Sequence, residues 1–197
     1  EDNNLTTVCT KDLASALCAN QSLTQLNLND NNLGYPGVKQ LCEALSNTEV
    51  KIQRLELEGN NLTADCTEDL TSALITNHSL TELHLNNNNL GDCGVKRLCE
   101  ALRNPECKIQ SLGLDSNRLT DGCTDDLVSA LSTNRSLRFL DLSSNSFTDG
   151  SVSALRRLIQ TCTSLEEIWL KRNKFSSDKR NKMASRQGIR AGVTLSV

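Results

Sequence analysis

Apolar residues recur along this chain at fixed positions, and one polar position follows them in every copy. Leucines fill most of the apolar slots of the pattern LxxLxLxxNxL, which occurs six times. Its asparagines are Asn31, Asn60, Asn88, Asn117, Asn145 and Asn173, and Asn3 begins a truncated seventh copy. Successive asparagines lie 28, 29, 28, 29, 28 and 28 residues apart. This regular period predicts a chain of similar structural units stacked side by side.

Each unit contains a strand pattern followed by a helix pattern. The central L-x-L alternates apolar and polar positions, as in Leu26–Leu28, which predicts a strand with one buried side. Later in the unit the spacing becomes helical, because Val38, Leu41 and Leu45 lie at i, i+3 and i+7. Each unit is therefore expected to be one strand and one helix.

The alternation of strands and helices predicts the fold. Parallel strands stack about 4.8 Å apart, whereas packed helices need roughly 8–10 Å, so the stack must curve. We predict an α/β leucine-rich-repeat solenoid, a horseshoe with a parallel β-sheet on the concave face and α-helices on the convex face, in alternating 28- and 29-residue repeats. It is expected to be a single domain over residues 1–197, with a truncated first repeat at 1–22, full repeats at 23–175 and a C-terminal cap at 176–197.

Threonines mark the expected starts of three helices. Thr10, Thr67 and Thr124 each precede carboxylates in the next turn, a combination that favours the positive end of a helix. We expect these threonines to be N-caps.

The repeated asparagine has a structural explanation. Its amide both donates and accepts hydrogen bonds, so it can satisfy backbone groups in the turn after each strand. We expect the six copies (Asn31, Asn60, Asn88, Asn117, Asn145 and Asn173) to form a structural ladder and no catalytic site.

Solvent-facing strand positions line the expected concave face and are the candidate binding residues. They are Glu56, Glu58, Glu82, His84, Asp115, Phe139, Asp141, Trp169, Lys171 and Arg172. Phe139 and Trp169 stand out as an aromatic pair on adjacent strands, bordered by the two basic residues, and exposed tryptophan and arginine are frequent interface anchors. Two alternatives remain: the C-terminal cap folds back over Trp169, or the face is merely solvated.

The charge of the chain is uneven. Formal net charge is −3, but residues 171–197 hold eight basic residues against Asp178, which leaves 13 basic and 23 acidic residues for 1–170. The basic residues are Lys171, Arg172, Lys174, Lys179, Arg180, Lys182, Arg186 and Arg190. This end is expected to be a solvated cap or a contact for an acidic partner. Nucleic-acid binding is not expected, because no basic stripe continues along the repeats.

Nine cysteines are present, and their placement argues against a disulfide scaffold. Cys42 and Cys99 occupy one helix slot, while Cys9, Cys66 and Cys123 share another, so equivalent cysteines lie too far apart to pair. We expect buried free thiols and a reducing, cytoplasmic compartment. Five N-x-S/T sequons are attributed to chance in an asparagine-rich chain; they begin at Asn4, Asn20, Asn61, Asn77 and Asn134.

Motifs of enzymatic chemistry are missing from the sequence. It has no G-x-x-x-x-G-K-S/T phosphate loop and no C-x-x-C pair, and its two histidines have no evident metal or nucleophile partner. No run approaches 18 apolar residues, so no membrane segment is expected. We predict no catalytic residues, metal or cofactor, and a role other than that of an enzyme.

Three segments resemble a known family. V-K-Q-L-C-E-A-L (38–45), V-K-R-L-C-E-A-L (95–102) and N-P-E-C-K-I-Q-S-L (104–112) are similar to ribonuclease-inhibitor-type leucine-rich repeats. They most resemble the C-terminal repeats of NOD-like receptors, of the pyrin-type branch or its fish-expanded relatives. The closing G-V-T-L-S-V (192–197) resembles the final capping strand of such domains.

The resemblance implies a function. It indicates the protein-interaction and autoinhibitory or sensing module of a cytosolic NOD-like innate-immune (inflammasome) receptor, whose partners are its own nucleotide-binding domain, neighbouring subunits or a ligand protein. The main alternative is a stoichiometric protein inhibitor similar to the ribonuclease inhibitor, and a third possibility is a repeat scaffold with no immune role. That inhibitor is richer in concave aromatics than this chain, which has one tryptophan, so the receptor interpretation is favoured.

Overall fold

A computed structural model describes residues 3–185 and 189–197 of the chain. Its strands form one sheet in the order β1-β2-β3-β4-β5-β6-β7, and all neighbouring pairs are parallel. The strands are Gln25–Asn27 (β1), Arg54–Glu56 (β2), Glu82–His84 (β3), Ser111–Gly113 (β4), Phe139–Asp141 (β5), Glu167–Trp169 (β6) and Thr194–Ser196 (β7). Consecutive strands of the sequence are therefore neighbours in space.

One helix follows each strand up to β6, and another precedes β1. The helices are Thr7–Ala19 (α1), Gly34–Leu45 (α2), Thr67–Thr76 (α3), Gly91–Arg103 (α4), Thr124–Thr133 (α5), Val152–Thr161 (α6) and Ser177–Ala184 (α7). Short 3-10 helices lead into α3, α5 and α6; they are Ala64–Cys66 (η1), Asp121–Cys123 (η2) and Asp149–Ser151 (η3). The expected strand–helix unit is confirmed in each full repeat.

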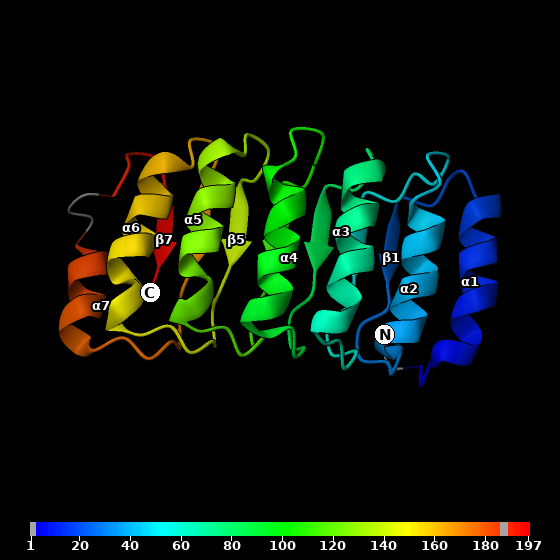
Figure 1. Cartoon of the computed structure of the whole chain (residues 1–197), viewed down its shortest axis with the longest axis horizontal. Coiled ribbons are helices and arrows are strands. Elements are labelled where there is room, and N and C mark those ends of the chain that lie inside the picture. Colours follow the sequence, from blue (N-terminus) through cyan, green and yellow to red (C-terminus); the bar gives the residue numbers. More distant parts are fainter. Residues whose placement is uncertain (1–2, 186–188) are drawn as a thin grey trace.

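The helices form one layer and the sheet another, as Figure 1 shows from the helical side. The core lies between the two layers. Leu55, Leu83, Leu112 and Leu140, the central residues of four strands, are at most 2% exposed. Burying each such side chain contributes about 1.5–3 kcal/mol. The predicted leucine-rich-repeat solenoid is confirmed, and the open side of its sheet is the concave face.

The threonine caps predicted for three helices are wrong. Thr67 and Thr124 are the first residues of α3 and α5, and Thr10 lies inside α1. Each hydroxyl donates to the backbone carbonyl three residues earlier. The reason is that a 3-10 turn leads directly into α3 and into α5, so the helical backbone begins one turn before the predicted threonine. A cap does occur at that earlier point in two repeats, where Thr120 Oγ1 accepts a hydrogen bond from Gly122 N at 3.1 Å and Thr148 Oγ1 accepts one from Gly150 N at 3.2 Å.

The repeated asparagines bind the backbone of adjacent repeats. Asn88 Nδ2 donates to Leu57 O at 2.9 Å in the preceding strand segment and to Leu85 O at 3.0 Å in its own. Its Oδ1 accepts from Asn60 N at 3.1 Å and Leu62 N at 2.9 Å. Asn145 repeats this arrangement two repeats further along the solenoid. Each amide therefore joins one repeat to the one before it.

A second series of hydrogen bonds, made by aspartates, was missed at the sequence level. Each aspartate lies four residues after a repeat asparagine and accepts from a backbone N–H of the following repeat at 2.8 Å. The pairs are Asp92 with Thr120, Asp121 with Thr148 and Asp149 with Ser176. The hydrogen bonds from Ser176 lower the pKa of Asp149. The constant four-residue offset was the signal that would have revealed this series.

We expect Asp121→Ala to lower the free energy of unfolding by about 1 kcal/mol, the usual cost of losing a side chain that satisfies a helix-start amide. Asp121 accepts from both Thr148 N and Thr148 Oγ1. The matched control is Asp125→Ala, which removes an exposed ion pair to Arg157 at 2.9 Å and one of the two carboxylates in the first turn of α5, and should cost only about 0.5 kcal/mol. Urea unfolding measures both, and equal losses would refute the assignment.

All nine cysteines are free thiols, as the sequence predicts. Cys42, Cys66, Cys99, Cys107, Cys123 and Cys162 are buried, whereas Cys9, Cys18 and Cys93 are exposed. The expectation that Cys9 shares the buried environment of its two register equivalents is wrong. The 3-10 turns that hold those equivalents pack against the preceding repeat, and α1 has no earlier helix beside it among the described residues.

Thiol labelling should separate the two sets of cysteines. Burial raises the pKa of Cys66 and of Cys99 to about 12, so neither is a thiolate near neutral pH. We expect iodoacetamide at pH 8 to modify Cys9, Cys18 and Cys93 in the folded protein and every cysteine in denaturant, as counted by intact mass. Native labelling of Cys66 at the rate of Cys18 would contradict this burial.

Two of the sequon asparagines have structural roles. Asn77 and Asn134 follow α3 and α5, are at most 5% exposed, and donate to Leu45 O at 2.8 Å and Leu102 O at 2.9 Å. Asn20 follows α1 in the same register. Their spacing of 57 residues, two repeats, was the sign that they form a series.

Candidate protein-interaction surface

The candidate surface is the side of the sheet that faces away from the helices. The last residues of the strands pair in register across it, in the order Asn27, Glu56, His84, Gly113, Asp141, Trp169 and Ser196. Seven strands about 4.8 Å apart make a ribbon roughly 30 Å long, which is enough for a protein partner.

The predicted site residues all lie along this ribbon, but their exposure differs. Half-buried residues are Glu56, Glu58, Glu82, His84, Asp115, Phe139 and Trp169; Lys171 and Arg172 are exposed. Asp141, expected to face solvent, is only 9% exposed. Its in-register neighbour is the bulky Trp169, which shields it. Burial raises the pKa of Asp141, and the hydrogen bond from Ser143 N at 2.9 Å opposes that shift.

Phe139 and Trp169 contact each other, as expected for an aromatic pair on adjacent strands. Their ring centroids are 5.1 Å apart with the planes at 87°, an edge-to-face arrangement. Trp169 Nε1 donates to Glu167 Oε1 at 2.6 Å, and Lys171 Nζ lies 5.7 Å from the indole centroid. These contacts hold the indole in one orientation while leaving part of it accessible.

A shallow hollow of about 200 Å³ lies beside the indole ring. Its lining comes from three consecutive repeats: Asp115, Asp141, Ser143, Ser144, Trp169, Lys171 and Arg172. The structure thus brings together five of the ten predicted binding residues, and Phe139 supports the hollow through its contact with Trp169. An aromatic wall next to charged groups is a common feature of protein-binding surfaces.

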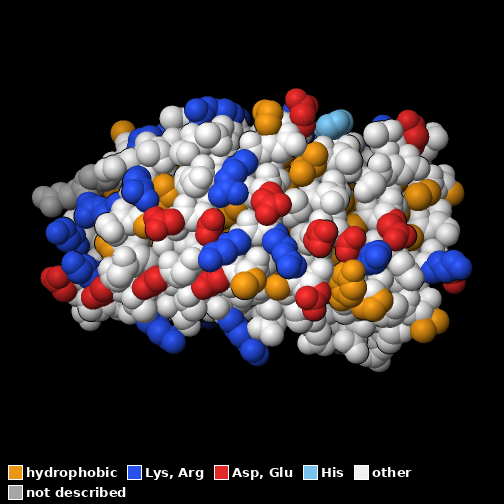
Figure 2. Space-filling model, viewed as in Figure 1, with side chains coloured by type: hydrophobic (Ala, Val, Ile, Leu, Met, Phe, Trp, Pro, Cys, Tyr) orange, Lys and Arg blue, Asp and Glu red, His pale blue; other side chains and the backbone are white. Residues whose placement is uncertain are grey.

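The C-terminal cap extends the sheet beside β6. Ser196 of β7 is the in-register partner of Trp169, so the last strand lies next to the indole-bearing strand. Arg190 turns inward and donates to Cys162 O at 3.2 Å, which attaches the cap to the body. The exposed basic residues of α7 include Arg180 and Lys182, and Figure 2 shows basic side chains gathered at that end. Arg186, part of the predicted basic set, is outside the described residues.

The carboxylates of the first strands have partial partners. Glu82 forms an ion pair with Arg54 at 2.6 Å and lies 4.0 Å from His84. Glu56 Oε2 accepts from the side-chain amides of Asn27 and Asn29 at 2.7 and 2.9 Å. The sequence grouped these carboxylates correctly on one face but could not show which of them are neutralised.

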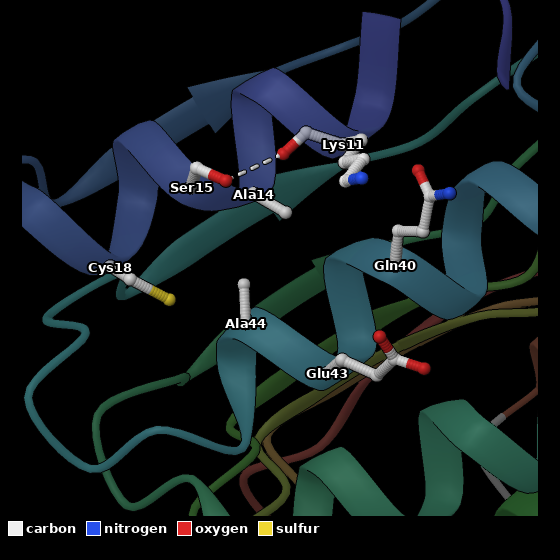
Figure 3. Close-up of a pocket in the computed structure, with 7 residues that line it drawn as sticks. All are labelled: Lys11, Ala14, Ser15, Cys18, Gln40, Glu43 and Ala44. Carbon is white, nitrogen blue, oxygen red and sulfur yellow. Dashed lines mark hydrogen bonds between the residues drawn. The ribbon is translucent and has the colours of Figure 1, made fainter. Parts of the chain in front are cut away.

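A larger hollow, of about 510 Å³, lies on the opposite, helical side. Figure 3 shows its lining side chains, which project from α1 and α2 toward one another. Ser15 Oγ is satisfied within its own helix by Lys11 O at 3.0 Å. The lining combines small side chains with polar ones, among them one basic residue, Lys11, and one acidic residue, Glu43.

The described part of the chain holds neither a cluster of metal ligands nor a membrane-spanning helix. Within residues 3–185 and 189–197, no group of three or more His, Cys, Asp or Glu side chains is placed to hold a metal ion. In the same part of the chain, every helix is too short or too polar to cross a bilayer.

These features define a class of protein. Repeats of one parallel strand and one helix, joined by an asparagine ladder, give this chain the fold of leucine-rich-repeat proteins. The Leucine Rich repeat family matches residues 19–42, 76–99 and 133–155. The tropomodulin C-terminal domain of Caenorhabditis elegans has the same fold, with a TM-score of 0.64 at 19% identity, over 90% of this chain and 96% of that one.

Within that class the repeats are homologous to those of the NACHT, LRR and PYD domains-containing proteins. Protein 3 of Homo sapiens is 46% identical over 136 residues, 69% of this chain. Protein 12 of Homo sapiens is 41% identical over 131 residues, 66% of this chain. The chain spans about 13% and 12% of the length of these two relatives. The predicted resemblance to NOD-like receptor repeats is therefore confirmed.

Proposed function

We propose that this chain is the protein-interaction and autoinhibitory or sensing module of a cytosolic NOD-like innate-immune receptor. The observation that carries the proposal is the accessible aromatic hollow at Trp169 on the open face of the sheet. Homology to receptors whose names specify NACHT, LRR and PYD domains supports it. The partner is the receptor's own nucleotide-binding domain, a neighbouring subunit or a ligand protein, and the chain itself performs no catalysis.

The cysteine chemistry supports a cytosolic location. Nine free thiols suit a reducing compartment, where disulfides do not persist. Asn77 and Asn134 also support it, because their buried amides serve the backbone and are not accessible to a glycan in the folded protein. Glycans on either residue of the native protein would argue against this location.

Autoinhibition is tested in the full-length receptor to which the proposal assigns this chain. Deleting the segment should raise the oligomeric fraction of resting receptor, measured by size-exclusion chromatography with light scattering. Adding the separate chain in excess should lower that fraction again. A deletion that leaves the resting oligomeric state unchanged, together with no binding of the added chain, would refute the proposal.

The ribonuclease-inhibitor alternative rests on the acidic part of the concave face, which suits a basic enzyme. Titrating a pancreatic-type ribonuclease with this chain separates the two functions. Stoichiometric inhibition would favour the alternative, whereas unchanged ribonuclease activity supports the receptor module. The coding sequence upstream of Glu1 gives a second test: a Walker-type phosphate loop supports the receptor, and further repeats up to the start codon support the inhibitor.

A further inference from the structure

The concave face has opposite charges at its two ends. Toward β1 and β2, Asp30, Glu56 and Glu58 supply carboxylates, whereas Lys171 and Arg172 follow β6. The sequence already placed Glu56, Glu58, Lys171 and Arg172 on one face, and the sheet order adds Asp30 to the acidic end and sets the two groups at opposite ends of the ribbon. The proposed function needs a partner on this face, and the charge distribution restricts which partner fits.

The acidic end is poorly neutralised. Glu58 forms no ion pair among the described residues, and burial together with the neighbouring carboxylate of Asp30 raises its pKa. The cation of β2, Arg54, is already paired with Glu82 at 2.6 Å. Mutual repulsion of carboxylates means that a positively charged partner group gains more here than near an isolated acid.

The basic end combines positive charge with an apolar wall. Lys171 and Arg172 are exposed and form no ion pair within the described part of the chain. Both line the hollow beside Trp169, together with Asp115 and Asp141. Asp115 is half-buried and Asp141 is only 9% exposed, so the two cations are the exposed charges at the rim of the hollow. The ring of Trp169 also contacts Phe139. Arg172 has a φ of 56°, the left-handed conformation of the turn after the strand. A bulky apolar side chain entering this hollow would bury aromatic surface with two cations at its rim.

We propose that the concave face binds a bipartite protein segment laid across the strands. An apolar side chain with an adjacent carboxylate occupies the Trp169 hollow, and basic side chains lie over Asp30, Glu56 and Glu58. β2 and β6 are four strand spacings apart, so the two parts of the segment are separated by roughly 19 Å. This inference rests on the proposed function and specifies the chemistry of its partner.

Charge complementarity selects this partner over simpler ones. A uniformly basic protein would face repulsion at Lys171 and Arg172, and a uniformly acidic segment would face it at Glu58. The two ends therefore favour a ligand whose own charges change sign along its length. A uniformly charged ligand is an outcome that the experiment can detect.

The probe is a synthetic peptide with two arginines, a Gly/Ser spacer of about six residues, a leucine and two glutamates; the extended spacer spans roughly 20 Å. Its composition-matched isomer has the leucine beside the arginines instead. Trp169 is the only tryptophan of the chain, so its fluorescence reports occupancy of the hollow directly. We expect the first peptide to bind about tenfold more tightly than the isomer.

Charge reversal provides the decisive control. Glu58→Lys should weaken the first peptide about tenfold, and replacing the peptide's arginines with glutamates should restore binding to that variant. Glu49→Lys is the matched control, because Glu49 is exposed in the segment between α2 and β2, away from the strand ends. It should leave the affinity within about twofold.

Each outcome distinguishes between the hypotheses. Equal affinity for both isomers, tighter binding of an all-arginine peptide, absence of charge-reversal rescue, or no fluorescence change at all would overturn the bipartite proposal. None of these results depends on the full-length receptor. The deletion test of autoinhibition can therefore succeed while this inference fails, and the reverse also holds.

Discussion

Asn88→Ala is expected to lower the free energy of unfolding by about 3–5 kcal/mol, more than any other single substitution of a buried residue predicted for this chain. The amide of Asn88 accepts from two backbone N–H groups and donates to three backbone carbonyls, and the residue is 8% exposed. Alanine leaves these buried groups unsatisfied, at about 1–3 kcal/mol each for those that water does not reach. The melting temperature should fall by roughly 10 °C.

The neighbouring residue offers a matched control. Asn89 is exposed, and its side chain forms no hydrogen bond in the described structure. Asn89→Ala should change the unfolding free energy by less than about 0.5 kcal/mol. Chemical unfolding followed by circular dichroism measures both variants. A loss at Asn88 no larger than the loss at Asn89 would show that the ladder does not hold the repeats together.

Replacing both Phe139 and Trp169 with alanine should weaken binding of the proposed partner by about 2–4 kcal/mol, or roughly 30- to 1,000-fold. The two rings stabilise each other at 5.1 Å, and Trp169 forms the wall of the hollow. Removing both eliminates the apolar anchor point, whereas the surrounding charges remain. Isothermal titration calorimetry with the receptor's nucleotide-binding domain is the direct measurement.

The control for this pair must be an exposed aromatic elsewhere. Tyr35 is 38% exposed in α2, on the helical side of the solenoid, so Tyr35→Ala should leave the affinity unchanged. The double variant must first melt within a few degrees of the parent, because both rings are half-buried. If it is stable and still binds every candidate partner normally, the hollow has no role in recognition.

Much of the fold was predictable because the repeat states the same physical requirement six times. The leucines of each L-x-L have to be buried, and Asn31 and its equivalents have to bond backbone groups in the turn. Because all six copies show the same pattern, a position that is ambiguous in one copy can be assigned from the others. The failures occur where the repeats differ. Cys9 lies in α1, which has no earlier helix beside it among the described residues, and Thr124 follows a 3-10 turn that periodicity does not reveal.

The sequence predicted which site residues share one face of the sheet, but not which of them contact one another. Alternation along a strand shows that Phe139 and Trp169 lie on the same side as Glu56. It cannot show that Arg54 neutralises Glu82, that Asp141 is buried, or that Asp121 bonds Thr148. These contacts depend on side-chain directions between neighbouring repeats, and no periodicity specifies them.

The sequence by itself determined the repeat, the order of strand and helix, and the residues that turn away from the core. Only the tertiary structure decided which of those residues meet: the edge-to-face contact of Phe139 with Trp169, and the separation of free carboxylates from free cations on one sheet. The physical reason is how far apart in the sequence the interacting residues lie. The leucine pattern is complete within each repeat and can be seen in the sequence, whereas contacts between strands on the concave face join residues about 27 to 30 positions apart, once the strands have stacked.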